Sequence, residues 1–585
     1  MSRSEITIQD IEPLIPFSRA STESFLTGRW SGRKPAWVEK TSPCREACPV
    51  GNDIARAFSY ASKGLIDEAL RVYREENPLP GVCGRVCYHP CEGECNRRHF
   101  DEAINIRGFE RFLADKGRVA VEGRVPGGAR REEVAVIGSG PAGLSAAFHL
   151  ARRGYGVTIF EALPEPGGML MYGIPEYRLP KAVLRREIGY IRRMGVEIRT
   201  GVRVGRDASL ADIRKAHRAV FAAVGAHAGK RLALEGEELS CVMEGIMFLR
   251  SMAQGERTEV GRRVAVIGGG NTAVDCARTA RRLGGEEVRI VYRRSRAEMP
   301  ALAEDVASVE REGIFLDLLA APRRVISRNG RVSGIECIRM ELGPPDASGR
   351  PEPLPVRGSE FIVPVDTVIA AVGQTPEADF VRESGVRLDG RGMIERLPGT
   401  AATAIEGLFA GGDGAGARAF VADAIASGKM GAMAIACFLE GKDWRKELES
   451  HRIGKGPSFS FHHFMHPGED RVDLKHVVPY ESLNTTCVPY ADRSDNPPRM
   501  RPERGIETFK EVSAGLSPGL MEAEISRCFK CGTCTRCDLC FLLCPDISIG
   551  KAGNRGYEVK VDYCKGCGMC ASACPGQVIE MGGGR

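Results

Sequence analysis

EEVAVIGSGPAGLSAAFHLARRGYGVTIFEA, at residues 132–162, is the stretch that decides the fold of the central part of the chain. An apolar strand at 134–137 leads into a turn rich in glycine, and a helix follows. The glycines allow a tight turn and close approach of the backbone to a pyrophosphate, and the helix N-terminus supplies positive potential. Glu161 ends the next strand, where a carboxylate can hold a ribose hydroxyl. The stretch predicts a Rossmann-like dinucleotide-binding fold.

The same pattern returns at residues 262–294, RRVAVIGGGNTAVDCARTARRLGGEEVRIVYRR. Its second strand ends in Arg293 and Arg294 instead of an acid. An arginine at this place favours a 2′-phosphate, so we expect NADP(H) in preference to NAD(H). Arginines on a solvated strand end are the alternative. The residues expected to contact this second nucleotide are Gly268, Gly270, Asn271, Thr272, Ala273, Arg293 and Arg294.

Two later segments return the chain to the first fold: VDTVIAAVGQTP at 365–376 and GLFAGGDGAGARAFVADAIASGK at 407–429. This order resembles the flavoproteins with two dinucleotide-binding domains, in which the NAD(P) domain interrupts the FAD domain. The resemblance covers about residues 40–440 and includes YGIPEYRLPK at 172–181. It implies that Asp413 meets the ribityl and phosphate groups of FAD. The cofactor contacts expected in this fold are Gly138, Gly140, Pro141, Ala142, Gly143, Glu161, Gly168, Gly373, Gly412 and Asp413.

Two cysteine runs of the form C-x2-C-x2-C-x3-C-P lie near the C-terminus, the spacing of a bacterial ferredoxin with two [4Fe-4S] clusters. Three cysteines of each run surround one cluster and the fourth reaches the other, so Cys574 should complete the first cluster and Cys544 the second. A pair of zinc sites is the alternative. Cys528 and Cys531 precede the runs as bystanders or alternate ligands. The eight expected ligands are Cys534, Cys537, Cys540, Cys544, Cys564, Cys567, Cys570 and Cys574.

A second group of cysteines lies between residues 44 and 95, where apolar residues recur at helical spacing. Six cysteines split across a helical hairpin can converge on an iron-sulfur cluster. A zinc site or plain buried thiols are the competing interpretations. The six are Cys44, Cys48, Cys83, Cys87, Cys91 and Cys95.

These residues, in TSPCREACP, NPLPGVCGRVC and CEGEC followed by INIRGFERF, resemble the N-terminal iron-sulfur domain of the glutamate synthase small-subunit family. Dihydropyrimidine dehydrogenase and the large subunit of the NADH-dependent ferredoxin:NADP oxidoreductase share that domain. The resemblance assigns one cluster to Cys48, Cys87, Cys91 and Glu110. A C-x2-C pair that serves a second cluster in the relatives is absent here, where residues 35–43 read PAWVEKTSP. We therefore expect at least one N-terminal [4Fe-4S] cluster, with the ligand roles of Cys44 and Cys95 left open.

The composition restricts the partners. The chain has 82 basic and 76 acidic residues and a net charge of +6, without an arginine-rich tract, which excludes nucleic acid as an expected partner. No run of about 18 apolar residues occurs, so we expect no membrane span and a cytoplasmic protein. The 21 cysteines gather in short-spaced groups, which favours metal binding over disulfides. A homo-oligomer is possible.

The predicted fold class is multidomain α/β. A helical [4Fe-4S] domain precedes two Rossmann-like domains, with the NAD(P) domain inserted in the FAD domain, and an α+β ferredoxin domain of the bacterial type follows. The expected boundaries are 1–40 for an N-terminal arm that packs on another domain or is disordered, 41–125 for the helical domain, 131–255 and 376–442 for the FAD domain, 256–375 for the NAD(P) domain, 443–520 for a linker and 521–585 for the ferredoxin domain.

These cofactors together predict an electron-transfer function. A nicotinamide gives two electrons as hydride and a cluster accepts one, so flavin is the expected converter between them. We expect an NAD(P)H:acceptor oxidoreductase subunit with no catalytic acid-base residue. A body of this kind fused to a ferredoxin also resembles the NAD(P)H-oxidising partner of dissimilatory sulfite reductase and input subunits of 2-oxoacid oxidoreductases. A ferredoxin is a further possible partner. The alternatives are the glutamate synthase small subunit itself and a non-catalytic iron-sulfur scaffold or redox sensor.

Overall fold

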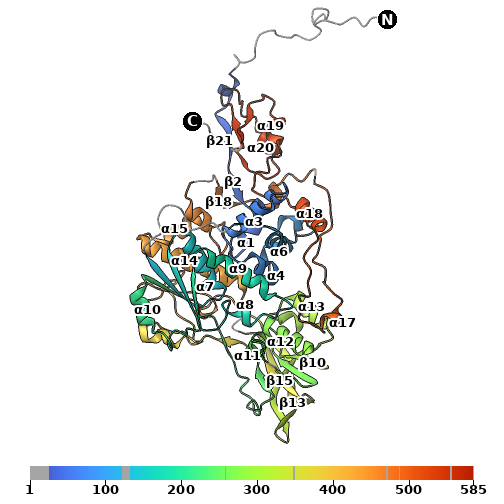
Figure 1. Cartoon of the computed structure of the whole chain (residues 1–585). Helices are drawn as coiled ribbons and strands as arrows, with labels where there is room; N and C mark the ends of the chain where they lie inside the picture. The colour runs from blue at the N-terminus through green and yellow to red at the C-terminus, as the bar shows by residue number, and fades with distance from the viewer. Residues whose placement is uncertain are drawn as a thin grey trace, which may run out of the picture.

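The computed structural model describes residues 26–120, 132–256, 258–346, 349–468, 472–486, 488–553 and 556–583. Residues 1–25, most of the predicted arm, lie outside this part. The domains form a column in Figure 1. The C-terminal cysteine-rich domain lies at the top, the N-terminal helices below it, the first Rossmann-like domain next, and the second at the bottom. The predicted fold class is confirmed.

The N-terminal domain is built from short helices around an aromatic core. Phe58 stacks on Phe109 with ring centroids 3.7 Å apart, and Tyr73 packs edge-on against Phe109. Asp53 and Asn105 accept backbone N–H groups at the starts of two of the helices, which satisfies donors that would otherwise have no partner. The helices are α1 (Pro43–Ala47), α2 (Ile54–Ala61), α3 (Ile66–Arg74), α4 (Pro80–Val86), α5 (Pro90–Gly93) and α6 (Ile106–Lys116).

The first Rossmann-like domain has a five-stranded parallel sheet in the order β17-β6-β3-β4-β5. The strands are β17 (Leu408–Ala410), β6 (Ala219–Ala222), β3 (Glu133–Ile137), β4 (Gly156–Glu161) and β5 (Glu197–Thr200). Helices α7 (Pro141–Arg152) and α14 (Val421–Glu440) pack together, and Ser145 Oγ donates to the Ile425 carbonyl at 2.8 Å. Among the described helices, α14 is the one long and apolar enough to cross a membrane, but 67% of its apolar window is buried. Here it is a core helix.

The second Rossmann-like domain is inserted between β6 and β17, as predicted. Its parallel sheet has the order β11-β10-β9-β15-β8. The strands are β11 (Phe315–Leu318), β10 (Glu287–Tyr292), β9 (Arg263–Ile267), β15 (Thr367–Ala370) and β8 (Val242–Glu244), with helices α11 (Gly245–Ala253), α12 (Asn271–Arg282) and α13 (Ala303–Arg311). An antiparallel meander of β12 (Ala320–Arg328), β13 (Arg331–Pro345) and β14 (Pro351–Val363) extends from its lower end (Figure 1). Short strands β7 (Ala228–Gly229) and β16 (Gln374–Thr375) pair where the chain leaves and returns.

Strands from both ends of the described chain join the C-terminal domain to the body. That domain contains α19 (Leu539–Leu542), α20 (Met569–Ala573), β19 (Ile549–Lys551), β20 (Tyr557–Val559) and β21 (Ile579–Gly583). Strand β1 (Arg33–Trp37) pairs antiparallel with β21. Strand β2 (Glu39–Thr41) pairs parallel with β18 (Val472–Val477). The described part of the predicted arm therefore supplies one strand to the C-terminal domain and begins a second strand that pairs with β18.

The predicted linker at 443–520 is instead largely packed against the body, which corrects that expectation. It contains α15 (Trp444–His451), α16 (Phe461–Met465), β18 and α17 (Pro502–Gly505), and α18 (Pro518–Arg527) follows. Phe459 and Phe461 are fully buried. Farther along, the Val512 N–H donates to the Tyr177 carbonyl, and Arg282 donates to the Thr508 carbonyl. These contacts could not be predicted from the polar and proline-rich composition, because backbone carbonyls form many of them.

A buried ion pair joins three of these parts. The Lys429 ammonium on α14 contacts the Glu76 carboxylate after α3 at 2.9 Å, and both side chains are about 1% exposed. Lys429 also donates to the carbonyls of Val50 and Phe459. Glu76 accepts from the Ser460 hydroxyl and the Phe461 N–H. The N-terminal domain, the first Rossmann-like domain and the segment at residues 459–461 therefore meet at one salt bridge.

Replacing Lys429 by Met should lower the free energy of unfolding by about 3–5 kcal/mol, because the variant leaves a buried carboxylate without its cation. Denaturant unfolding measures the change. Lys215→Met provides the control, since Lys215 lies on an exposed helix with Asp212.

Burial alone would raise the pKa of Glu76, but Lys429 and Arg45 hold it at about 2. The stability from this carboxylate is present above pH about 4.5 and is lost as the pH falls toward 2. Equal stability of the Lys429 and Lys215 variants would contradict this role.

Candidate functional site

A cavity of about 670 Å³ lies between the two Rossmann-like domains. The first domain contributes the turn after β3 and the segment around Asp413, and the second contributes Asn271 and Thr272 at the start of α12. Val86, the last residue of α4 in the N-terminal domain, also lines it. Three domains therefore border one cavity.

The turn after β3 has the backbone that a pyrophosphate site requires. Gly138 has a φ of +99°, and an added Cβ would collide with the Ala223 carbonyl. An added Cβ at Gly143 would collide with the Gly138 carbonyl, so this residue permits close packing of α7 on the strand. Gly140 faces open space, where backbone can approach a ligand. Gly138, Gly140, Pro141, Ala142 and Gly168 line the cavity, whereas Gly143 lies behind them.

Glu161 braces this turn as well as lining the cavity. One carboxylate oxygen accepts from the N–H and the hydroxyl of Ser139, at 2.9 and 2.5 Å. The other accepts from the Leu163 N–H at 2.7 Å. The acid predicted to hold a ribose thus also fixes the loop on which the dinucleotide would rest.

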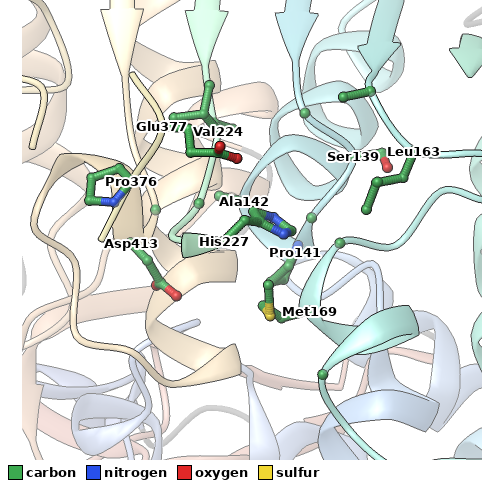
Figure 2. A pocket seen from close by; sticks show the side chains of 18 of the residues that line it. Ser139, Pro141, Ala142, Leu163, Met169, Val224, His227, Pro376, Glu377 and Asp413 are labelled. Atoms are coloured by element: carbon green, nitrogen blue, oxygen red, sulfur yellow. The ribbon is translucent and has the colours of Figure 1, made fainter. Parts of the chain in front are cut away.

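Asp413 lies on the opposite side of the cavity from Ser139 and Leu163 (Figure 2). It begins the 3-10 helix η7 (Asp413–Ala415), after Gly412 with a φ of +70°. Its Oδ1 is buried and has no hydrogen-bond partner among the described residues. Burial, with a smaller contribution from Asp423, raises the pKa of Asp413 to about 6. A buried acceptor without a donor fits a ligand hydroxyl such as those of a ribityl chain.

Several cavity residues were not found from the sequence. His227 lies between the segment carrying Asp413 and the one carrying Leu163 in Figure 2. Burial lowers the pKa of its imidazole, which favours the neutral form. Arg203, Arg206 and Arg250 also line the cavity and bring positive charge. None belongs to a spaced motif, so no local signal marked them.

The second nucleotide fold shows a mixed outcome for the predicted contacts. Asn271 and Thr272 line the cavity, while Gly268 and Gly270, in the turn before α12, and Ala273, buried in its first turn, do not. Gly373 does not line the cavity, although its neighbour Gln374 does. Arg293 is exposed. Arg294 is buried, and its guanidinium contacts Asp346 at 2.5 Å and the Pro351 carbonyl at 2.7 Å. The interpretation of Arg294 as a nucleotide ligand is therefore corrected: it anchors the antiparallel meander.

Salt bridges hold the two folds together beside the cavity. Arg178 lies in the predicted motif at 172–181 and lines the cavity. Its guanidinium contacts Asp275 on α12 at 2.8 Å and Asp305 on α13 at 2.8 Å. The Tyr177 hydroxyl donates to the Asp275 carbonyl at 3.2 Å. The start of α12 is thereby fixed relative to the turn after β3.

A small cavity of about 20 Å³ lies in the N-terminal domain. Glu110 is buried there and accepts from the Asn77 and Asn52 amides at 2.7 and 3.4 Å. Burial raises the pKa of Glu110 well above its ordinary value. The cysteines that line this cavity are Cys48, Cys83, Cys87 and Cys91. Cys83 was counted in the sequence group but not proposed as a ligand. Cys44 and Cys95 do not line this cavity.

The C-terminal domain contains two further cavities of about 10 and 20 Å³. Each is lined by the first three cysteines of one run and the fourth of the other. The first group is Cys534, Cys537, Cys540 and Cys574, and the second is Cys564, Cys567, Cys570 and Cys544. No three His, Cys, Asp or Glu side chains among the described residues are arranged to hold a single metal ion. The four ligands of a [4Fe-4S] cubane lie farther apart than the ligands of a single metal ion.

Comparison with known proteins identifies the family. Residues 132–428 match the model of the pyridine nucleotide-disulphide oxidoreductases. This chain belongs to the pyridine nucleotide-disulphide oxidoreductase family. Residues 39–121 match the 4Fe-4S cluster domain II of dihydropyrimidine dehydrogenase, and residues 557–580 match a 4Fe-4S binding domain. The protein is thus an iron-sulfur flavoprotein with 4Fe-4S binding domains on both sides of the oxidoreductase fold.

Three relatives illustrate the range of the family. The chain is 40% identical over 521 residues to the NADP(+)-dependent formate dehydrogenase subunit beta of Moorella thermoacetica, covering 84% of this chain and 70% of the relative. It is 41% identical over 435 residues to the NADPH-Fe(3+) oxidoreductase subunit beta of Geobacter sulfurreducens, covering 68% and 65%. It is 37% identical over 420 residues to the glutamate synthase [NADPH] small chain of Escherichia coli, covering 68% and 88%. The chain therefore spans about two thirds of the length of the first two relatives.

Removing the Asp413 side chain should weaken FAD binding by this oxidoreductase. Asp413→Ala takes away a buried charged acceptor, and loss of one such hydrogen bond costs about 1.5–3 kcal/mol, or roughly 10- to 100-fold in the dissociation constant. Flavin titration of the FAD-free protein measures the constant. Asp212→Ala, at an exposed position outside the cavity, is the matched control.

The same carboxylate predicts a pH dependence. In the FAD-free protein Asp413 binds a proton below pH about 6. A ligand hydroxyl donates to the ionised form, so FAD affinity should rise as the pH increases through 6. The rise should be absent in Asp413→Asn, and a pH-independent wild type would rule out this contact.

Proposed function

We propose that the chain is the NADPH-oxidising electron-transfer subunit of a larger redox enzyme. It would pass electrons between NADPH, FAD, the [4Fe-4S] clusters and a catalytic partner, in either direction. The observation that supports this proposal is the common cavity. Residues of the FAD-type fold, the NAD(P)-type fold and the N-terminal iron-sulfur domain all border it.

The N-terminal cysteine cavity lies directly behind the flavin side of this cavity. Val86 lines the large cavity and Cys87, the next residue, lines the small one. On α14, Val421 and Ala424 face the large cavity and Ala422 faces the small one. The same two helices therefore border both spaces, which supports direct electron transfer between their occupants.

The residues of this chain would bind and orient the cofactors instead of transferring protons. FAD, when bound, exchanges a hydride with the nicotinamide and single electrons with a cluster. Asn271 and Thr272 would position the NADPH, with Arg178 and Asp275 fixing their helix. Asp413 would hold the flavin side chain. We assign no catalytic acid or base.

The C-terminal domain would present the exit to the partner. It lies at one end of the column (Figure 1), and Leu542, Ile547 and Met569 are exposed apolar residues on it. The names of the relatives, a formate dehydrogenase subunit and an NADPH-Fe(3+) oxidoreductase subunit, support an assembly with a catalytic redox subunit. Candidate partners include 2-oxoacid oxidoreductases, sulfite reductase and ferredoxin. We also propose a cytoplasmic location, because none of the 20 described cysteines forms a disulfide.

The alternative functions have less support. The glutamate synthase small chain of Escherichia coli is similar to 68% of this chain. The C-terminal ferredoxin-type domain argues for an electron acceptor other than glutamate synthase. A non-catalytic scaffold does not require a cavity shared by two nucleotide folds. Purification with a glutamine-dependent large subunit would favour the first alternative. Failure of NADPH to reduce the flavin would favour the second.

Replacing Cys567 by Ala should interrupt the relay near its exit. Cys567 is exposed and lines the second cavity of the C-terminal domain, so the variant should lose one cluster. NADPH should still bleach the flavin absorbance, while a reductive titration without oxygen should take up about one electron fewer per chain. Cys241→Ala, in the nucleotide domain, is the control. Equal loss of flavin reduction and of cluster reduction would contradict the proposed order of centres.

Arg293→Ala should reduce the preference for NADPH over NADH. A charge-assisted hydrogen bond to a phosphate contributes about 1.5–3 kcal/mol, so the ratio of the two dissociation constants should change roughly 10-fold or more. Arg294→Ala should leave the ratio unchanged and lower stability instead, because its partner is Asp346. Nucleotide titrations of both variants test this, and an unchanged ratio in Arg293→Ala would remove the 2′-phosphate assignment.

A further inference from the structure

Four cysteines remain outside the three cysteine-lined cavities although they lie beside them in the sequence. Cys44 precedes Cys48, and Cys95 follows Cys91. Cys528 and Cys531 precede the first C-terminal run. In the relatives that the sequence resembles, a C-x2-C pair serves a second N-terminal cluster, and this pair is absent here. The resemblance does not group these four cysteines into one site.

The fold joins the two pairs through hydrogen bonds. Asn96, the residue after Cys95, donates its side-chain amide to the Cys531 sulfur at 3.4 Å. Arg97 donates to the carbonyl of Arg527, the residue before Cys528, at 2.8 Å. Helix α18, which ends there, lies beside the N-terminal helices in Figure 1. Segments more than four hundred positions apart are therefore fastened side by side.

The four thiols are buried or partly buried and lie in segments that the fold brings together. Cys95 and Cys531 are buried, while Cys44 and Cys528 are partly buried and pack against the main core. Helix α1, which carries Cys44, packs against α5, which ends two residues before Cys95. Four neighbouring sulfurs that form no disulfide are a ligand set for a cationic iron group.

We propose that Cys44, Cys95, Cys528 and Cys531 hold an additional [4Fe-4S] cluster, with half of its ligands supplied by the segment that leads into the ferredoxin domain. Cys528 and Cys531 take the place of the C-x2-C pair that is absent upstream of Cys44. The chain would then carry four clusters: two in the C-terminal domain, one at Cys48, Cys87, Cys91 and Glu110 or Cys83, and this one.

The surrounding backbone holds the Cys528–Cys531 loop in a defined position. Buried Arg527 contacts Asp101 at 3.0 Å and Glu524 at 2.9 Å, which fixes the end of α18. After the loop, the Lys40 N–H donates to the Gly532 carbonyl, and the Gly532 N–H donates to the Gly576 carbonyl. Gly532 has a φ of +74°, and an added Cβ would collide with the Lys40 carbonyl. Protein contacts therefore fix the loop on both sides.

The location gives the site a role in the proposed relay. Cys44 and Cys48 lie at the two ends of α1, and Cys48 lines the N-terminal cavity. Cys531 is three residues before Cys534, which lines the first cavity of the C-terminal domain. The additional cluster would thus lie between the flavin-side cluster and the ferredoxin clusters. This role rests on the proposed function, whereas cluster binding does not.

The metal content of the anaerobically purified, full-length protein tests the number of clusters. Four [4Fe-4S] clusters require about sixteen iron and about sixteen sulfide per chain, and three require about twelve. We expect the higher value. About twelve iron with one zinc would mean a zinc site at these cysteines, and about twelve iron with no other metal would mean plain thiols. Either result would overturn the proposal.

Variants test the ligands independently of electron transfer. Cys528→Ala and Cys44→Ala should each lower the iron content by about four per chain and remove the same paramagnetic resonance signal of the reduced protein. The double variant should lose no more iron than either single variant, because all the ligands serve one cluster. Cys241→Ala should lose none. FAD content per chain reports on folding, and retained FAD with unchanged iron in Cys528→Ala would refute the site.

Should the single variants fail to fold, the iron and sulfide content of the native protein still decides the number of clusters. Failure of the proposed relay would appear differently. In that case iron would be about sixteen per chain, but NADPH would not reduce the clusters through the flavin. Metal analysis and NADPH titration therefore separate the two hypotheses.

Discussion

The salt bridge between Glu76 and Lys429 is the interaction on which the arrangement of domains depends. A charged pair with almost no exposure is costly to bury unless every remaining hydrogen-bonding position is used. Here the other partners are carbonyl, hydroxyl and N–H groups from Val50 and residues 459–461. The pair can thus form only when the N-terminal domain, α14 and the C-terminal segment are all in place. It specifies one relative position of the iron-sulfur domain and the flavin-type sheet.

This position makes the separation of redox centres a property of the fold. Val86 and Ala424 line the large cavity, and Cys87 and Ala422, which are their near neighbours in the sequence, line the small one. Arg178 of the first nucleotide fold contacts Asp275 and Asp305 of the second, and these contacts fix the two folds relative to each other. Buried ion pairs, instead of flexible connections, set the distances. Such pairs favour specificity of arrangement more than stability.

The sequence was informative wherever a motif is local. The turn from Gly138 to Gly143 and the doubled cysteine runs have fixed short spacings, so the fold class could be predicted from them. Arg294 could not be assigned correctly, because its partner Asp346 lies in a meander that the strand-end pattern does not reveal. The packing of residues 443–520 was hidden for a similar reason, since backbone groups supply many of its contacts. The position of His227 in the cavity and the hydrogen bond from Asn96 to Cys531 depend on contacts between distant segments, which no spacing rule describes.

The pairing of β1 with β21 has a consequence for biosynthesis. A ribosome makes β1 early, and its hydrogen-bonding partner is among the later strands to emerge. Strand β2 is likewise synthesised before its partner β18. Until then each is an unpaired edge that can join the wrong neighbour, a hazard that chaperones commonly relieve. Maturation of the C-terminal clusters therefore follows the synthesis of β21, when the nascent polypeptide first contains both halves of that small sheet.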